Sequence, residues 1–130
     1  MQTSRLTTIP ALADLPAAEL DELATVVREV YVDAGARVVS IDDYGDAIYF
    51  VEEGEATVET EGDGPSEALG PGDTLGEIGL LLTGERTATV VARTPMRLLS
   101  LSGYDFERIR AGVPELERSL RRLAIERASR

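Results

Sequence analysis

The run LGEIGLLLTGERTATV, at residues 75–90, contains the residue types that could bind an anionic sugar ligand. Gly76 and Gly79 would let the backbone approach a ligand closely, and the amides of a short helix beginning there would point at a phosphate. Arg86 offers a planar fork of donors for the same group, whereas Glu77 can accept hydrogen bonds from a sugar hydroxyl. The pattern predicts a ligand with a phosphate on one side and a polyol on the other.

The same residues also have a purely structural interpretation. Gly76 and Gly79 could serve only as turn residues, and Glu77 could pair with Arg86 as an ion bridge within the protein. Arg86 is followed by Thr-Ala-Thr, at residues 87–89, rather than by acidic residues. These neighbours favour a ligand phosphate over a surface ion pair as the partner of Arg86.

This run resembles the phosphate-binding cassette of the cyclic-nucleotide-binding domains, a family found in bacterial transcription regulators, protein kinase regulatory subunits and nucleotide-gated channels. The family pattern is Gly-Glu-apolar-small-Leu, a short variable stretch, and then Arg, a small residue, Ala and Thr or Ser. Leu75 stands where the family usually has Phe. The flanking runs GDAIYFVEEGEATV, GPGD and RLLSLSGYDF are similar to the family as well, so that the resemblance extends from about Leu12 to the end. The matching cassette residues are Gly76, Glu77, Ile78, Gly79, Leu80, Arg86, Thr87, Ala88 and Thr89.

The resemblance implies a role for each of these residues. Glu77 would take the ribose 2′-hydroxyl, and Arg86 would pair with the cyclic phosphate beside backbone amides near Gly79 and Thr87. The Thr87 hydroxyl can bond the phosphate or a guanine edge, so that cyclic GMP stays open beside cyclic AMP, the default ligand. In channel-type members an arginine late in the C-terminal helix closes over the purine, and Arg127 stands there, although a solvated charge is the alternative. The complete predicted ligand-binding set is Val58, Leu75, Gly76, Glu77, Ile78, Gly79, Arg86, Thr87, Ala88 and Arg127.

Composition narrows the function classes. The 130 residues include no cysteine, histidine or lysine, which removes disulfides, the commonest metal ligand and the lysine of a triphosphate-binding loop. We therefore expect neither an enzyme nor a metal site. The net charge of −11 divides into −13 for residues 1–104 and +2 for residues 105–130, so that most of the chain would repel a nucleic acid.

The pattern along the chain predicts a single domain over residues 1–130, mainly β with flanking helices. Residues 1–9 read as a flexible tail, residues 10–29 as an N-terminal helical segment, and residues 30–102 as short strands of period two. Such strands favour a barrel or a sandwich. The family resemblance implies an antiparallel β-barrel, a double-stranded β-helix of jelly-roll type, interrupted by a cassette helix. Residues 103–130 predict two helices, the second starting at Pro114 with a stripe of Leu116, Leu120, Leu123 and Ala124. The stripe suits either packing on the barrel or a homodimer seam.

No stretch reaches the roughly 18 consecutive apolar residues of a membrane span, and the start lacks a signal-peptide pattern, so that we expect a cytoplasmic location. The chain could still be a fragment of a longer protein. The sequence as a whole predicts a sensor that binds a cyclic nucleotide. Ligand binding would be signalled through its C-terminal helix to an attached or associated effector. We prefer a channel or transporter as this effector, and an effector that is an enzyme stays open as well. The alternative is a degenerate copy that binds no nucleotide and serves as a protein-interaction or dimerisation module.

Overall fold

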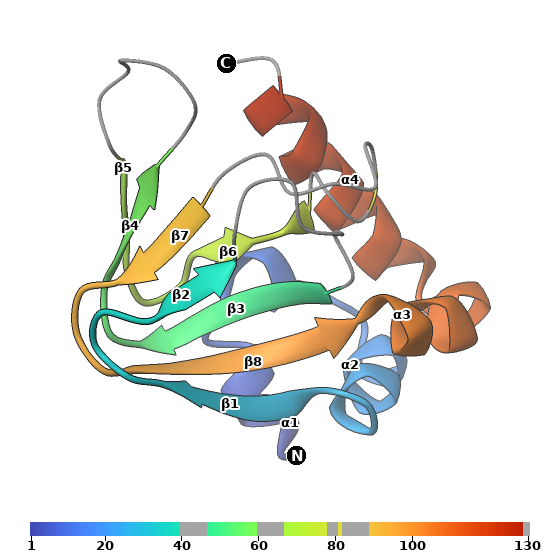
Figure 1. The fold of residues 1–130 in the computed structure, drawn as a ribbon. Coiled ribbons are helices and arrows are strands. Elements are labelled where there is room, and N and C mark those ends of the chain that lie inside the picture. The colour runs from blue at the N-terminus through green and yellow to red at the C-terminus, as the bar shows by residue number, and fades with distance from the viewer. Residues whose placement is uncertain (40–46, 60–66, 78–80, 82–88, 129–130) are drawn as a thin grey trace.

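The computed structural model describes residues 1–39, 47–59, 67–77, 81 and 89–128 of the chain. Within these residues, eight strands form two four-stranded sheets, and helices flank them on both sides in the sequence (Figure 1). The first sheet has the order β1-β8-β3-β6 and contains β1 (Arg28–Val32), β3 (Ala47–Glu53), β6 (Thr74–Leu75) and β8 (Met96–Ser102). The second sheet has the order β2-β7-β4-β5 and contains β2 (Arg37–Val39), β4 (Ala56–Glu59), β5 (Glu67–Leu69) and β7 (Thr89–Ala92).

Strands that are distant in the sequence are neighbours in both sheets. β8 lies between β1 and β3, and β7 lies between β2 and β4, in each case with antiparallel pairing. Such crossing between two sheets is typical of jelly rolls. The predicted fold class, mainly antiparallel β of jelly-roll type with flanking helices, is therefore confirmed. The predicted cassette helix falls outside the described residues.

The central strands of the first sheet, β3 and β8, are buried on both faces. In β8, Leu98 belongs to an apolar cluster between the two sheets, whereas the next residue, Leu99, belongs to a larger cluster beneath the helices. β3 divides in the same way, with Phe50 on the helix side and Val51 between the sheets. Because successive side chains of a strand point to opposite faces, a strand covered on both sides needs apolar residues at consecutive positions. This double burial explains the run RLLSL in β8.

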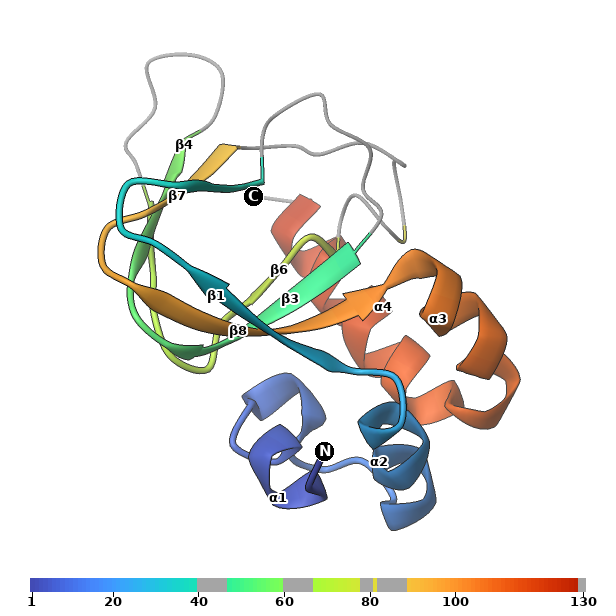
Figure 2. The same ribbon diagram turned by 60° about the horizontal axis from the view of Figure 1, so that its bottom comes forward.

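Residues 1–9, predicted to be a flexible tail, instead belong to the folded core. They contain helix α1 (Thr3–Leu6), and the side chains of Leu6 and Ile9 are buried in the helix-side cluster. Arg5 holds α1 to the first sheet, since its Nε donates to Glu52 Oε2 at 3.1 Å. Figure 2 shows the N-terminal helices gathered on one side of this sheet. The sequence prediction missed α1 because a helix of four residues provides too short an amphipathic pattern.

The N-terminal helical segment is shorter than predicted. A 3-10 helix η1 (Pro10–Leu12) precedes helix α2 (Ala17–Ala24), which ends before the predicted segment of residues 10–29 does. Thr25 is the C-cap residue of α2, and β1 begins at Arg28. The β-branched residues Thr25, Val26 and Val27 favour this early end, because such side chains lose rotamer freedom in a helix.

The C-terminal helices agree with the sequence prediction. Helix α3 (Gly103–Ile109) continues into η3 (Arg110–Gly112), and α4 (Pro114–Ala128) follows. Ser102 caps α3 by accepting from the amide of Asp105. The stripe of α4 faces its own core, since Leu116, Leu120 and Ala124 have no exposed surface. A homodimer through α4 would therefore have to use other residues of this helix.

Gly54 provides a test of the turn between β3 and β4. Its φ is +94°, and a Cβ placed on it would lie 2.4 Å from the carbonyl oxygen of Pro95. Gly35 has a similar φ of +86° with nothing within 4 Å. Gly54→Ala should therefore reduce the free energy of unfolding by about 3 kcal/mol or more, against about 1–2 kcal/mol for Gly35→Ala, as measured by urea denaturation. Equal losses in the two variants would contradict the close approach.

Glu117 should make stability depend on pH. Hydrogen bonds from Arg110, with a further one from Arg121, hold the pKa of Glu117 at about 2, below its usual value of 4.5. Since the folded pKa is the lower one, the stabilisation is complete above about pH 4.5 and is lost as the pH falls towards 2. Arg110 is partly exposed, so that solvent screening leaves a contribution of about 1 kcal/mol.

Glu117→Gln should therefore be less stable than the wild type at pH 7, and the two should converge as the pH falls below 4, as measured by urea denaturation across this range. Glu126→Gln, at an exposed position of the same helix, is the matched control and should change stability by less than about 0.5 kcal/mol at pH 7. A Glu117→Gln difference that stayed constant down to pH 2.5 would contradict the ion pair as its source.

Candidate functional site

The site is built where the cassette leaves the first sheet. β6 pairs with β3 through Tyr49↔Leu75 and Phe50↔Thr74, which fixes the position of the last residue before the cassette. Gly76 follows with a φ of +92°, a conformation that residues with a Cβ rarely adopt. The chain thereby turns out of the strand, and the next side chain, that of Glu77, is only 1% exposed. A glycine at position 76 is thus needed to bury this carboxylate.

Five of the ten predicted ligand residues are described by the structure, namely Val58, Leu75, Gly76, Glu77 and Arg127. The other five lie outside the described residues, namely Ile78, Gly79, Arg86, Thr87 and Ala88. The geometry therefore concerns the sugar side of the predicted site and its cover. The phosphate side rests on the sequence.

Glu77 forms an ion pair with Arg127, which is 50 residues away in the sequence. Arg127 Nη1 lies 2.7 Å from Glu77 Oε1, and the same nitrogen donates to the backbone carbonyl of Thr74. The side chain of Arg127 is 24% exposed, so that solvent screens this pair only in part. Within the described part of the chain, Arg127 of α4 is thus the ion-pair partner of Glu77. The ion bridge between Glu77 and Arg86 that the sequence left open lies outside the described residues.

The second carboxylate oxygen of Glu77 is different. Oε2 is buried, and within the described residues it has no hydrogen-bond partner. A buried acceptor without a donor costs about 1–3 kcal/mol, and more when it carries charge. Because Oε1 already accepts a hydrogen bond from Arg127, Oε2 is the oxygen of this side chain that can accept a hydrogen bond from a hydroxyl group.

Leu75 and Val58 belong to the same apolar surface. Leu75 is 4% exposed and is part of the cluster between the two sheets, against which the half-buried Val58 packs. Leu75 comes from the first sheet and Val58 from the second, so that the cluster joins both sheets next to the cassette. Leu75 and Val58 thus form an apolar wall between the two sheets, and its contact with a ligand stays a prediction.

Thr74 is a site residue that the sequence analysis missed. It is 2% exposed, and it contributes its backbone carbonyl to Arg127. Every residue has a backbone carbonyl, so that no signal in the sequence could identify this acceptor. Its position follows only from the pairing of β6 with β3.

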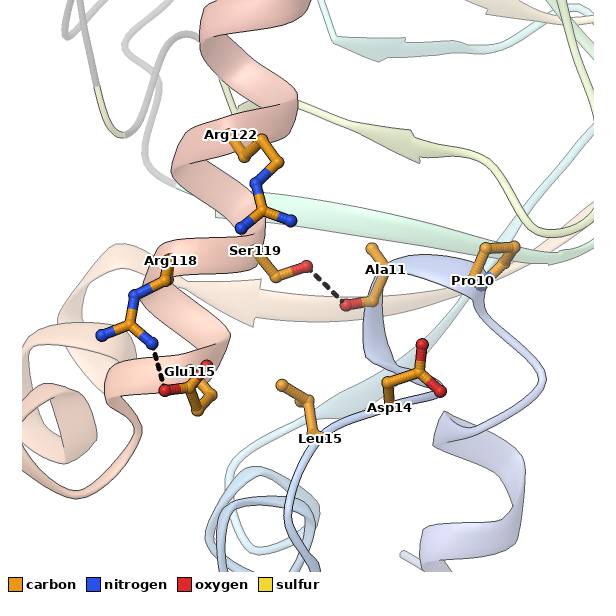
Figure 3. Close-up of a pocket in the computed structure, with 8 residues that line it drawn as sticks. All are labelled: Pro10, Ala11, Asp14, Leu15, Glu115, Arg118, Ser119 and Arg122. Atoms are coloured by element: carbon orange, nitrogen blue, oxygen red, sulfur yellow. Dashed lines mark hydrogen bonds and ion pairs between the residues drawn. The ribbon is translucent and has the colours of Figure 1, made fainter.

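A separate groove of about 190 Å³ lies between the N-terminal segment and α4 (Figure 3). None of its lining residues belongs to the predicted ligand set, and all of its charged groups lie outside the cassette. The cassette therefore remains the candidate site. The groove is lined by Pro10, Ala11, Asp14, Leu15, Glu115, Arg118, Ser119 and Arg122.

Comparison with known proteins agrees with the geometry. A family model described as a cyclic nucleotide-binding domain matches residues 29–112. A cyclic nucleotide-gated potassium channel of Rhizobium etli is 38% identical over 119 residues, which make up 92% of this chain and 33% of the channel. The cAMP-dependent protein kinase regulatory subunit of Yarrowia lipolytica is 37% identical over 102 residues, 78% of this chain and 27% of the subunit. This chain therefore spans between a quarter and a third of the length of these relatives.

Solved structures with the same fold include two that share appreciable sequence identity. The regulatory domain of Toxoplasma gondii PKA, crystallised with cAMP, has a TM-score of 0.79 and 29% identity, covering 98% of this chain and 48% of that one. The N-terminal domain of a transcriptional regulator from Streptomyces coelicolor has a TM-score of 0.74 and 31% identity, covering 96% and 90%. No helix among the described residues has the length and apolarity to span a membrane.

The ion pair predicts that substitutions of two arginines of α4 will lower the stability of the protein by different amounts. Arg127→Ala removes the partner of the buried Glu77 and should lower the free energy of unfolding by about 1–3 kcal/mol, less than for a fully buried pair because Arg127 is partly exposed. Arg122→Ala, at an exposed position on the same helix, should change it by less than about 0.5 kcal/mol. Urea denaturation measures both.

A double-mutant cycle with Glu77→Gln isolates the pair itself. Once Glu77 is neutral, Arg127→Ala should cost about 1 kcal/mol less than it does in the wild type, because no buried charge is left without a partner. An identical cost of Arg127→Ala in both backgrounds would mean that the pair contributes nothing to stability.

Proposed function

Because the chain belongs to the cyclic nucleotide-binding domain family, we propose that it is a sensor that binds a cyclic nucleotide at the cassette, cyclic AMP in preference to cyclic GMP. The preference is supported by relatives, since the Yarrowia subunit is named as cAMP-dependent and the Toxoplasma domain was crystallised with cAMP. In this proposal, residues 75–90 hold the sugar and the phosphate, and α4 provides the cover.

The observation that carries the proposal is the unpaired oxygen of Glu77. A ribose hydroxyl placed at Oε2 would donate a hydrogen bond to a buried acceptor that otherwise has no partner within the described residues. A hydrogen bond to a charged group contributes about 1.5–3 kcal/mol, and relief of an unsatisfied buried acceptor adds to the gain. The ligand would therefore satisfy an acceptor that the described residues leave without a partner.

Arg86 is the proposed partner of the cyclic phosphate. The family resemblance places its guanidinium beside the backbone amides of Gly79 and Thr87, a set of donors that suits a phosphate. The sequence supports this role, since Arg86 is followed by small and hydroxylated residues rather than by acids. Local donors have to overcome the net charge of −11, which opposes an anionic ligand at long range.

Arg127 is proposed to help the ligand in two ways. Its ion pair balances the charge of Glu77, which would otherwise repel a phosphate bound a few ångströms away. Its guanidinium edge is engaged by Glu77 and by the Thr74 carbonyl, and a planar guanidinium bound at its edge can still stack through its face on a purine. Docked α4 is therefore the state that favours ligand binding.

Signalling to an effector follows from the thermodynamic coupling between ligand binding and the docking of α4. If docked α4 strengthens ligand binding, then bound ligand must strengthen the docking of α4 by the same factor. Ligand would shift the population towards the docked helix, and an effector attached or associated through this helix would receive the change. Relatives in which the matched part makes up only 33% and 27% of the length support an effector in the same polypeptide, such as a channel or transporter, or an enzyme.

Calorimetric titration with cyclic AMP and cyclic GMP tests the proposal. The wild type should bind both, with cyclic AMP bound more tightly. Arg86→Leu should weaken binding about tenfold to a hundredfold or more, because a charge-assisted contact to the phosphate is lost. Arg28→Leu, which removes an exposed arginine of β1, is the matched control and should leave the affinity unchanged.

Glu77→Gln examines the sugar side in the same titration. It should weaken binding about tenfold, because an amide is a poorer acceptor than a carboxylate for the ribose hydroxyl. Circular dichroism spectra of all variants show whether the fold is retained. Absence of binding heat for both nucleotides in a folded wild-type protein would refute the sensor and favour the degenerate interaction module.

A further inference from the structure

Glu19 is a buried acidic residue that the ligand site does not use. It lies in α2, is 5% exposed, and points at the beginning of α4, almost one hundred residues later in the sequence. Its Oε2 accepts from the amide of Glu115 at 3.1 Å, and its Oε1 accepts from the amide of Leu116 at 2.8 Å. One carboxylate thus satisfies two of the free amides at the start of α4.

This cap is provided by another helix rather than by the residue before α4. Val113 precedes Pro114 and has an apolar side chain, which cannot accept a hydrogen bond from the helix amides. Glu19 replaces the missing local cap, and its negative charge suits the positive end of the helix dipole. Because the cap comes from α2, it also fixes where α4 begins relative to the N-terminal segment.

A second contact between the N-terminal segment and α4 lies one turn further along the helix. Ser119 Oγ donates to the backbone carbonyl of Ala11 at 2.8 Å, across the groove that Figure 3 shows. The far end of α4 is held by Arg127, through Glu77 and the Thr74 carbonyl. The helix is therefore attached at its start and middle to the N-terminal segment, and near its end to the cassette.

We propose that Glu19 is a positioning residue for the ligand site, and that it sets ligand affinity through the placement of Arg127. This inference rests on the proposed function, in which docked α4 favours the ligand. A helix of 15 residues is a stiff rod of about 20 Å. Loosening its start lets the rod tilt, and the tilt moves Arg127 at the opposite end. Glu19 touches no ligand and acts only through α4.

The main test is Glu19→Gln, measured by titration with cyclic AMP. The amide side chain keeps the size of glutamate but can accept from only one of the two backbone amides, so that the start of α4 is held less firmly. We expect the dissociation constant to rise about threefold to tenfold. Glu22→Gln removes the same charge from an exposed position of α2 and is the matched control, with no expected change.

A role in positioning Arg127 makes a prediction that a general loss of stability does not. In an Arg127→Ala background, Glu19→Gln should have no further effect on affinity, because the group that it positions is absent. An equal effect of Glu19→Gln in both backgrounds would overturn the proposal. So would an unchanged affinity in Glu19→Gln when the wild type binds cyclic AMP and Arg86→Leu does not, and in that case the proposed function would stand.

Two further measurements keep the test decisive. Amide hydrogen exchange at Glu115 and Leu116 should speed up in Glu19→Gln and not in Glu22→Gln, and unchanged exchange would overturn the cap. If Glu19→Gln fails to fold, Ser119→Ala takes its place and should raise the dissociation constant about twofold to fivefold in the wild type but not with Arg127→Ala. A wild type that binds neither nucleotide would refute the proposed function and this inference together.

Discussion

The ion pair between Arg127 and Glu77 joins the last helix to the first buried residue of the cassette, and most of the remaining architecture serves to bring these two side chains together. Glu77 can be buried because Gly76 turns the chain out of β6, whose register is fixed by β3. Arg127 can reach it because α4 is fully covered along Leu116, Leu120 and Ala124. A carboxylate at 1% exposure needs such compensation, since burying an unpaired charge would cost far more than one surface contact returns.

The two apolar clusters of the protein lie on opposite faces of the first sheet and hold different parts of the structure in place. The cluster between the sheets includes the apolar wall of Leu75 and Val58, whereas the helix-side cluster fixes α2, α3 and α4 on the outer face of the first sheet. Because β3 and β8 contribute to both clusters, the position of the helices and the shape of the wall depend on the same strands. The two clusters are thus parts of one continuous packed structure.

The sequence was sufficient for the parts that local chemistry decides. The short strands of period two and the helix that begins at Pro114 were predicted and are present. The family resemblance singled out Glu77 and Arg127, but it did not predict that they would pair with each other, because nothing in the order of residues states which face of α4 meets β6. The short helix α1 and the cap by Glu19 were missed for a similar reason, since each is stabilised by residues far away in the chain rather than by its own pattern.

The buried core extends beyond the residues that the family model matches. The family match begins at residue 29, yet Leu6, Ile9, Leu12, Leu20 and Leu23 lie under the first sheet and are buried with Phe50 and Leu99. A piece that began at residue 29 would lack these residues, and the helix-side face of β3 and β8 would lose the side chains that cover it. A fusion protein made from this domain should therefore keep residues 1–28.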